Sequence, residues 1–124
     1  MDNLTIKKTF TVTPHDTAEN VGSGSLPVLA TPIMVAWMEN TAMAIAAQSL
    51  APADTTVGIS MSVQHIKASA VGETITCTAR QTSADGRKLT FEITCTNADG
   101  DTVGTATHER FIVTAERFMA KLRK

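Results

Sequence analysis

The sequence predicts one α+β domain in which an antiparallel sheet wraps a single long apolar helix. A run rich in Ala and Met, from about Pro32 to Leu50, has a helical composition and is apolar around nearly its whole circumference. The segments that follow it alternate apolar and polar residues with a period of two, as strands do. One helix beside several consecutive strands is typical of a layered α+β architecture.

The bulk composition fits one domain covering residues 1–124, without linker or repeat. Hydrophobic residues make up 43% and charged residues 19%, which argues against disorder. The net charge of −1 provides no basic field for nucleic acid. The N-terminal MDNLTIKKTF has no signal-peptide core, and no stretch is apolar enough to cross a membrane. We therefore expect a cytoplasmic protein without nucleic-acid or membrane partners.

The helix has clear start and stop signals. Thr31 is the expected N-cap, and Pro32 occupies the first helical position, where its missing N–H costs nothing. Pro52 follows the end. Outside the helix we expect a first strand at 4–13, a loop at Thr17–Leu26, a tail helix at Ala115–Lys121, and strands at Val57–Lys67, Glu73–Thr82, Lys88–Thr96 and Thr102–Val113.

Two turn signals join the later strands, at Ser83–Gly86 and Asn97–Gly100. The first turn lies midway between Cys77 and Cys95, so the two cysteines should face each other across a hairpin. Reduced thiols packed in the core are the expected state, and a redox pair is the less favoured alternative.

Two ionisable residues interrupt the apolar pattern. Glu39 lies in the middle of the apolar helix, where a carboxylate needs either a partner or a purpose. A narrow polar edge formed with Asn40 is an equally good interpretation. His65 shares a predicted strand face with Val57, Ile59, Met61 and Val63, the face expected to contact the helix. A lone histidine there is usually structural, but two such residues at one interface indicate a site.

Two further residues could assist them. Thr31 lies two helical turns before Glu39, at the helix end whose partial positive charge suits a carbonyl oxygen gaining negative charge. Gly58 opens the strand that leads to His65, on the predicted opposite face, and could allow close approach to the backbone. His15 is expected in a loop and His108 on an uncertain strand face. Histidines so scattered predict no metal site.

Three segments together resemble the hotdog-fold acyl-coenzyme A (CoA) thioesterases, in particular the fluoroacetyl-CoA thioesterase-like family. They are LPVLATPIMVAWMENTA, VGISMSVQHIKASAVGETI and GTATHERFIV. The order Thr31, Glu39, His65, with these spacings, is the most specific part of the resemblance.

The resemblance implies a five-stranded antiparallel sheet wrapped around a central helix, and a homodimer, or a higher oligomer, with two active sites at the subunit interface. It implies that Thr31, Glu39 and His65 are catalytic and that the Gly58 N–H holds the thioester carbonyl. Arg110 matches an arginine near the coenzyme and is a candidate phosphate contact. CoA is then part of the substrate, and no separate cofactor or metal is implied.

The implied reaction is hydrolysis of an acyl-CoA thioester to a free acid and CoA. Glu39 would act as nucleophile or activate water, and both remain open. The alternatives are a hotdog hydratase or dehydratase, and a non-catalytic acyl-CoA binding module. The fluoroacetyl-specific enzyme has aromatic residues before the helix, whereas Val21–Leu26 here has none, so the sequence leaves the acyl group open.

Overall fold

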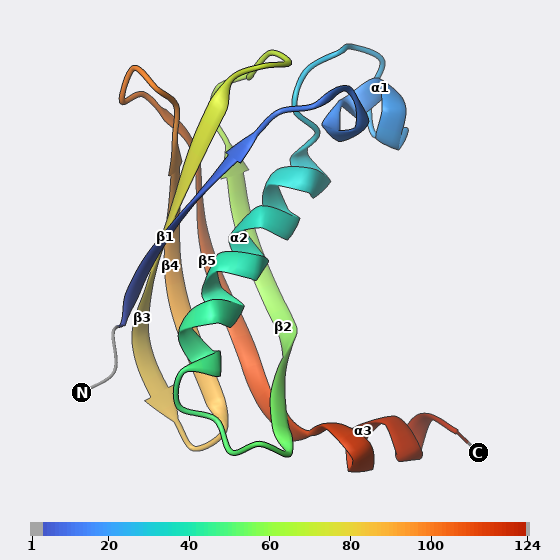
Figure 1. Cartoon of the computed structure of the whole chain (residues 1–124), viewed down its shortest axis with the longest axis vertical. Helices are drawn as coiled ribbons and strands as arrows, with labels where there is room; N and C mark the ends of the chain where they lie inside the picture. The colour runs from blue at the N-terminus through green and yellow to red at the C-terminus, as the bar shows by residue number, and fades with distance from the viewer. Residues whose placement is uncertain (1–3, 124) are drawn as a thin grey trace.

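The computed structural model describes residues 4–123, in which a curled five-stranded antiparallel sheet holds a long helix against one face (Figure 1). The strand order is β1-β3-β4-β5-β2, which places β1 and β2 at the two edges. The elements are β1 (Thr5–Thr11), a 3-10 turn (Pro14–Asp16), α1 (Ala18–Val21), α2 (Thr31–Ala47), β2 (Asp54–His65), β3 (Thr74–Asp85), β4 (Lys88–Thr96), β5 (Thr102–Thr114) and α3 (Ala115–Leu122). No helix within residues 4–123 combines the length and hydropathy that crossing a membrane requires.

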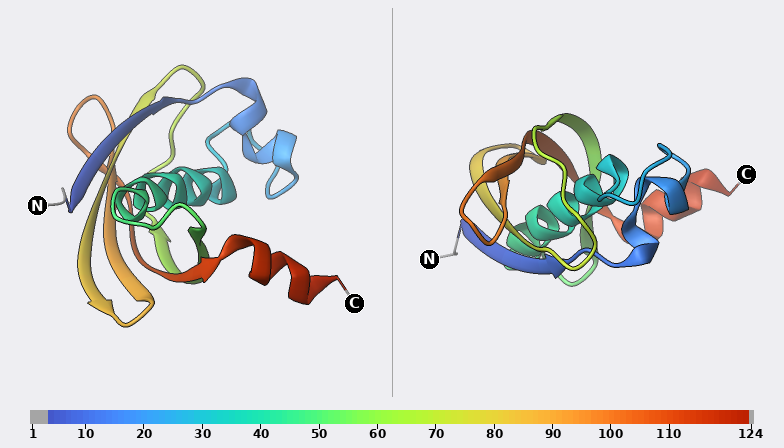
Figure 2. Two further views of the ribbon diagram at one scale, coloured as in Figure 1. Left: turned by 60° about the horizontal axis from the view of Figure 1, so that its bottom comes forward. Right: turned by 90° about the horizontal axis from the view of Figure 1, so that it is seen from above.

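The central helix packs one face against the sheet. Its buried residues are Met34, Met38, Thr41, Ala42, Ile45 and Ala46. The opposite face is only partly covered, since the Met43 side chain remains 39% exposed. The sheet therefore curls around the helix, as Figure 2 shows, but does not enclose it. The predicted helix is confirmed, while the wrapping within one chain is incomplete.

The helix start differs from the prediction. Ala30 is the N-cap and has no side-chain cap bond, while Thr31 is the first helical residue and Pro32 the second. Thr31 lies one residue inside the helix, past the cap position, and its hydroxyl bonds to His65. The helix ends at Ala47, three residues before the expected Leu50.

A β-bulge changes the predicted faces of β2. Gly58 pairs with Arg110 and Ser60 with Glu109, so Ile59 is an extra residue with no partner on β5. The bulge breaks the alternation at Ile59, whose side chain is 51% exposed. Gly58 thereby faces the helix, as do Met61, Val63 and His65 after the bulge. The prediction that placed Gly58 on the opposite face from His65 is wrong for this reason.

Two connections also differ from the prediction. The β3–β4 ladder continues to the pair Asp85 and Lys88, so the hairpin loop is Gly86 and Arg87 rather than Ser83–Gly86. Gly86 has φ of +62°, a conformation that suits glycine. The expected loop at Thr17–Leu26 contains α1, which begins at the N-cap Thr17 and ends at Gly22. The other strands and α3 lie within a few residues of their predicted positions.

The two cysteines face each other in the core, as predicted. Cys77 and Cys95 are cross-strand partners on β3 and β4, both free and both 0% exposed. Their Sγ atoms are 3.0 Å apart, a hydrogen-bond contact. That contact and burial raise the pKa of Cys95 above its usual value, so the reactive thiolate is disfavoured.

We expect both thiols to resist a water-soluble disulfide reagent in the folded protein, because both are fully buried. In denaturant, both should react at once, and titration should count two thiols per chain. Fewer than two free thiols in the unfolded, unreduced protein would show that the pair is a disulfide.

Candidate active site

The first part of the candidate site joins the start of α2 to the end of β2. The Thr31 hydroxyl lies 2.7 Å from His65 Nδ1. The other ring nitrogen, His65 Nε2, is buried and has no hydrogen-bond partner within residues 4–123. Burial lowers the pKa of His65, so the ring is neutral at physiological pH. A neutral histidine with one nitrogen fixed and the other unpaired is suited to proton transfer.

This pair lies at the edge of an open hollow of about 270 Å³. The hollow is lined by Thr31 and His65 together with Ala18, Ser23, Val28, Leu29 and Ala68. Most of these residues are small, and none is Phe, Tyr or Trp. The segment before the helix, predicted as a loop without aromatic residues, therefore forms one wall of the hollow beside the pair.

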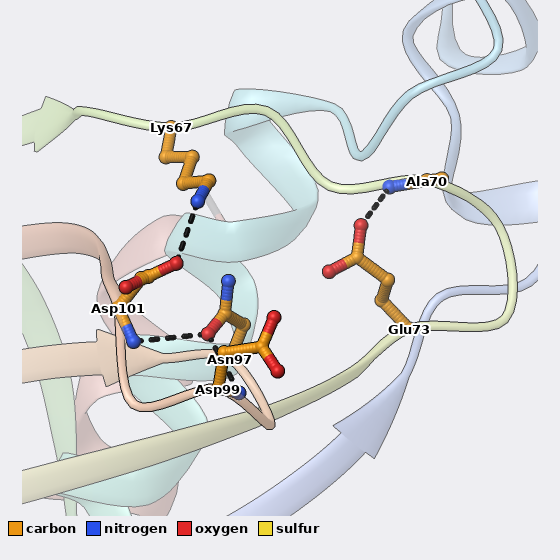
Figure 3. Close-up of polar contacts among 6 residues, drawn as sticks. All are labelled: Lys67, Ala70, Glu73, Asn97, Asp99 and Asp101. Atoms are coloured by element: carbon orange, nitrogen blue, oxygen red, sulfur yellow. Dashed lines mark hydrogen bonds and ion pairs between the residues drawn. The ribbon is translucent and has the colours of Figure 1, made fainter.

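Contacts beyond the end of β2 fix the position of His65. The amides of Ile66 and Lys67 both donate to the Val103 carbonyl. Figure 3 shows Lys67, on the segment after β2, reaching Asp101 in the β4–β5 turn, with Nζ and Oδ2 2.6 Å apart. That ion pair raises the pKa of Lys67 and lowers the pKa of Asp101. Asn97 Oδ1 in turn accepts from the Asp101 amide, so the segment after His65 is anchored to β5.

The following turn is anchored as well. In the same figure Glu73 Oε2 accepts a hydrogen bond from the Ala70 amide at 2.7 Å. Gly72 between them has φ of +96°, which explains the glycine in the Val71-Gly72-Glu73 segment. The role of this segment is to close the turn between β2 and β3.

The second part of the candidate site surrounds Gly58. A Cβ atom added at Gly58 would lie 2.9 Å from Glu39 Oε2, 3.2 Å from His108 Cε1 and 3.5 Å from Arg110 Nη1. The missing side chain therefore leaves a small space bounded by a carboxylate, an imidazole and a guanidinium. Glu39 is half-buried there. The alternative of a solvent-facing polar edge fits Asn40 better, because Asn40 accepts a hydrogen bond from the Lys8 ammonium at the surface.

The predicted site residues thus form two groups in one chain. Thr31 pairs with His65, and Glu39 lies with Gly58 and Arg110. Eight residues of helix separate Thr31 from Glu39, which corresponds to about 12 Å along the axis. The structure brings the members of each group together but does not bring the two groups into contact within one chain.

Arg110 is placed differently from a surface phosphate contact. Its side chain is 6% exposed and bonds to Thr56 and His108 in the interior. The contact with the coenzyme remains a prediction, and in this chain the guanidinium faces the Glu39 group.

Sequence reasoning did not find His108. The ring is fully buried between Ser60 and Arg110. In β5 the residues facing inward are Gly104, Ala106, His108 and Arg110, while Phe111 faces out and is 38% exposed. The alternation of His108 with Arg110 along β5 could have indicated that both side chains face inward. The run of apolar residues that follows them made this alternation hard to recognise. Among residues 4–123, no three His, Cys, Asp or Glu side chains form a metal-binding group.

We expect stability to fall between neutral and mildly acidic pH. Burial lowers the pKa of both His65 and His108 below the usual 6.5. As the pH falls through 6.5, the unfolded chain binds two protons that the folded chain does not bind, so the free energy of unfolding decreases.

Urea unfolding at about pH 7.5 and about pH 5.5 tests this expectation. The double variant His65→Gln/His108→Gln should lose most of the difference between the two conditions. An unchanged difference in that variant would assign the effect to other groups.

Comparison with known proteins identifies the family. Residues 12–116 match the model of the family described as FlK, fluoroacetyl-CoA-specific thioesterase. A fluoroacetyl-CoA thioesterase of Streptantibioticus cattleyicolor is 35% identical, covering 93% of this chain and 86% of its own length. The solved structure of the fluoroacetyl-CoA thioesterase FlK superposes with a TM-score of 0.91 at 31% identity, over 99% of this chain and 95% of that one.

A further structure, of a thioesterase superfamily member from Thermus thermophilus, has a TM-score of 0.90 over 99% of this chain and 90% of that one. At 23% identity it supports the fold alone. The predicted fold and family resemblance are confirmed. The chain belongs to the fluoroacetyl-CoA-specific thioesterase family and has the hotdog fold.

Proposed function

We propose that this protein hydrolyses an acyl-CoA thioester to a free acid and CoA, using Thr31, Glu39 and His65. One observation carries the proposal. The apolar helix α2 holds Glu39, whose carboxylate has no hydrogen bond or ion pair within residues 4–123. This carboxylate lies beside Gly58, the one residue of β2 that has no side chain. Family membership supports it, and a solved FlK variant is described in complex with acetyl-CoA.

The geometry supports a division of roles. Glu39 attacks the thioester carbonyl or activates water, since its oxygens are free for either step. His65, neutral and bonded to Thr31 through Nδ1, uses the unpaired Nε2 to take a proton from water and to give one to the leaving thiolate. The Gly58 N–H stabilises the oxyanion, assisted by the Thr31 hydroxyl at the positive end of α2.

A second copy of the chain would join the two groups. β2 is an edge strand of 12 residues that neighbours only β5, and its exposed Ile59 is an apolar residue on that edge. In antiparallel pairing of two β2 edges about a two-fold axis, a register centred on Ser62 pairs Met61 with Val63 and Ser60 with Gln64. Because Ile59 is the extra residue of the bulge, Gly58 then lies opposite His65 of the partner subunit. A homodimer of this kind completes two sites, each with Glu39 from one chain and His65 from the other.

The substrate is an acyl-CoA whose acyl group contacts the small residues beside Thr31. CoA carries phosphates, and Arg110 is the candidate contact for them, although it is only 6% exposed in one chain. The free thiols of Cys77 and Cys95 fit a reducing cytoplasm, which is the location we propose.

Replacing Glu39 with glutamine removes the carboxylate while keeping its shape. We expect Glu39→Gln to lose at least about 100-fold in kcat across a panel of acyl-CoA substrates, measured by release of free thiol. Glu116→Gln, on exposed α3, changes charge in the same way and should retain full activity. Thermal unfolding and size-exclusion profiles of both variants should match those of the wild type.

The same assays distinguish the alternatives. Full activity of a folded Glu39→Gln variant would contradict the assignment. Addition of water to enoyl-CoA without thiol release would indicate a hydratase. Acyl-CoA binding without turnover by the wild-type protein would indicate a binding module.

A further inference from the structure

The buried guanidinium of Arg110 lies near Glu39 but does not bind its carboxylate. Arg110 donates from Nε to the Thr56 hydroxyl at 2.8 Å, from Nη2 to the Thr56 carbonyl at 3.0 Å, and from Nη1 to His108 at 3.1 Å. None of these acceptors is a carboxylate. Burial lowers the pKa of Arg110 and the negative charge of Glu39 opposes that effect, but the two side chains form no ion pair.

His108 accounts for part of this orientation. Its Nδ1 lies 2.8 Å from the Ser60 carbonyl, which only accepts hydrogen bonds, so Nδ1 carries the proton. Its Nε2 lies 3.1 Å from Arg110 Nη1, which only donates, so Nε2 is the acceptor. Burial lowers the pKa of His108, which keeps the ring in this neutral form. The bulge at Ile59 presents the Ser60 carbonyl that fixes the ring.

His108 and Arg110 approach the Glu39 carboxylate at the space beside Gly58. Glu39 Oε2, His108 Cε1 and Arg110 Nη1 all lie within 3.5 Å of the point where a Cβ would stand. The carboxylate and the guanidinium are thus neighbours across a gap, in a partly buried place where charges interact more strongly than in water.

We propose that His108 is a positioning residue for the reaction, which holds Arg110 so that the guanidinium faces Glu39 without hydrogen-bonding to it. This inference rests on the proposed function of Glu39. The guanidinium then places a positive charge beside the carboxylate that attacks or activates water. Because the Arg110 donors are directed to His108 and Thr56, both carboxylate oxygens stay free for the substrate or water.

The arrangement explains why an ion pair is avoided. A bidentate contact between Arg110 and Glu39 would occupy the oxygens that the reaction needs. Without the acceptor on His108, Nη1 has Glu39 as its nearest charged partner. The other charged group of this region is Glu109, the neighbour of both residues on β5, and its carboxylate reaches Lys88 at 3.5 Å instead.

Two substitutions separate the functions of the His108 ring. His108→Asn can keep a donor toward Ser60 but has no atom in the place of Nε2, so it removes the acceptor for Arg110. His108→Gln can place its amide oxygen near the position of Nε2 and restore that acceptor. His15→Asn, the same change at an exposed histidine outside the site, is the matched control.

We expect His108→Asn to lower kcat about 10- to 100-fold with KM within about twofold of the wild type. His108→Gln should recover most of kcat, and His15→Asn should be unchanged. Wild-type kinetics in a folded His108→Asn variant would overturn the proposal, as would an equal loss in His108→Gln.

A structural readout separates this proposal from the proposed function. The Arg110 Nε–H, bonded to Thr56, should give a slowly exchanging NMR signal that broadens in His108→Asn and returns in His108→Gln. If wild-type protein hydrolyses no acyl-CoA, the proposed function fails, and the NMR comparison alone decides whether His108 orients Arg110. If wild-type activity depends on Glu39 but the Arg110 NMR signal and the kinetics are unchanged in His108→Asn, only the positioning proposal fails.

Discussion

The close approach of α2 to β2 at Gly58 is the contact on which the candidate site depends. A methyl group at that position would lie 2.9 Å from the Glu39 carboxylate, so an alanine there would displace the acid. The bulge at Ile59 turns Gly58 toward the helix and also presents the Ser60 carbonyl to His108. One irregularity in one strand therefore makes room for the carboxylate and fixes the ring that neighbours it.

The site combines residues that are fixed by several contacts with polar atoms that have no hydrogen-bond partner within residues 4–123. His65 is held by the anchored end of β2 and by Thr31, yet its Nε2 has no partner within residues 4–123. Arg110 and His108 are fixed by strand and backbone contacts, yet the carboxylate beside them is free. A buried polar atom without a partner costs free energy. Under the proposed function, a ligand and a second copy of the chain would supply the partners of these groups.

Much of this could be predicted from sequence. The helix was visible in composition and the strands in their alternation, while the pairing of Cys77 with Cys95 followed from the turn between them. Glu39 and His65 stood out because each interrupts an apolar pattern. The bulge at Ile59 was not visible, because nothing local marks an extra residue in an alternating strand. That error placed Gly58 on the wrong face. His108 was missed because its burial depends on hydrogen bonds from β2 and from Arg110.

Under the proposed function, Thr31 and His65 of one chain act with Glu39 of another. Heterodimers of Glu39→Gln and His65→Gln chains, purified with two different affinity tags, test this arrangement. Shared sites would leave one of the two sites fully intact, so the heterodimer should have about half the activity of the wild type while both parent homodimers have almost none. A stable heterodimer as inactive as its parents would show that each chain forms its own site and would overturn the shared-site arrangement.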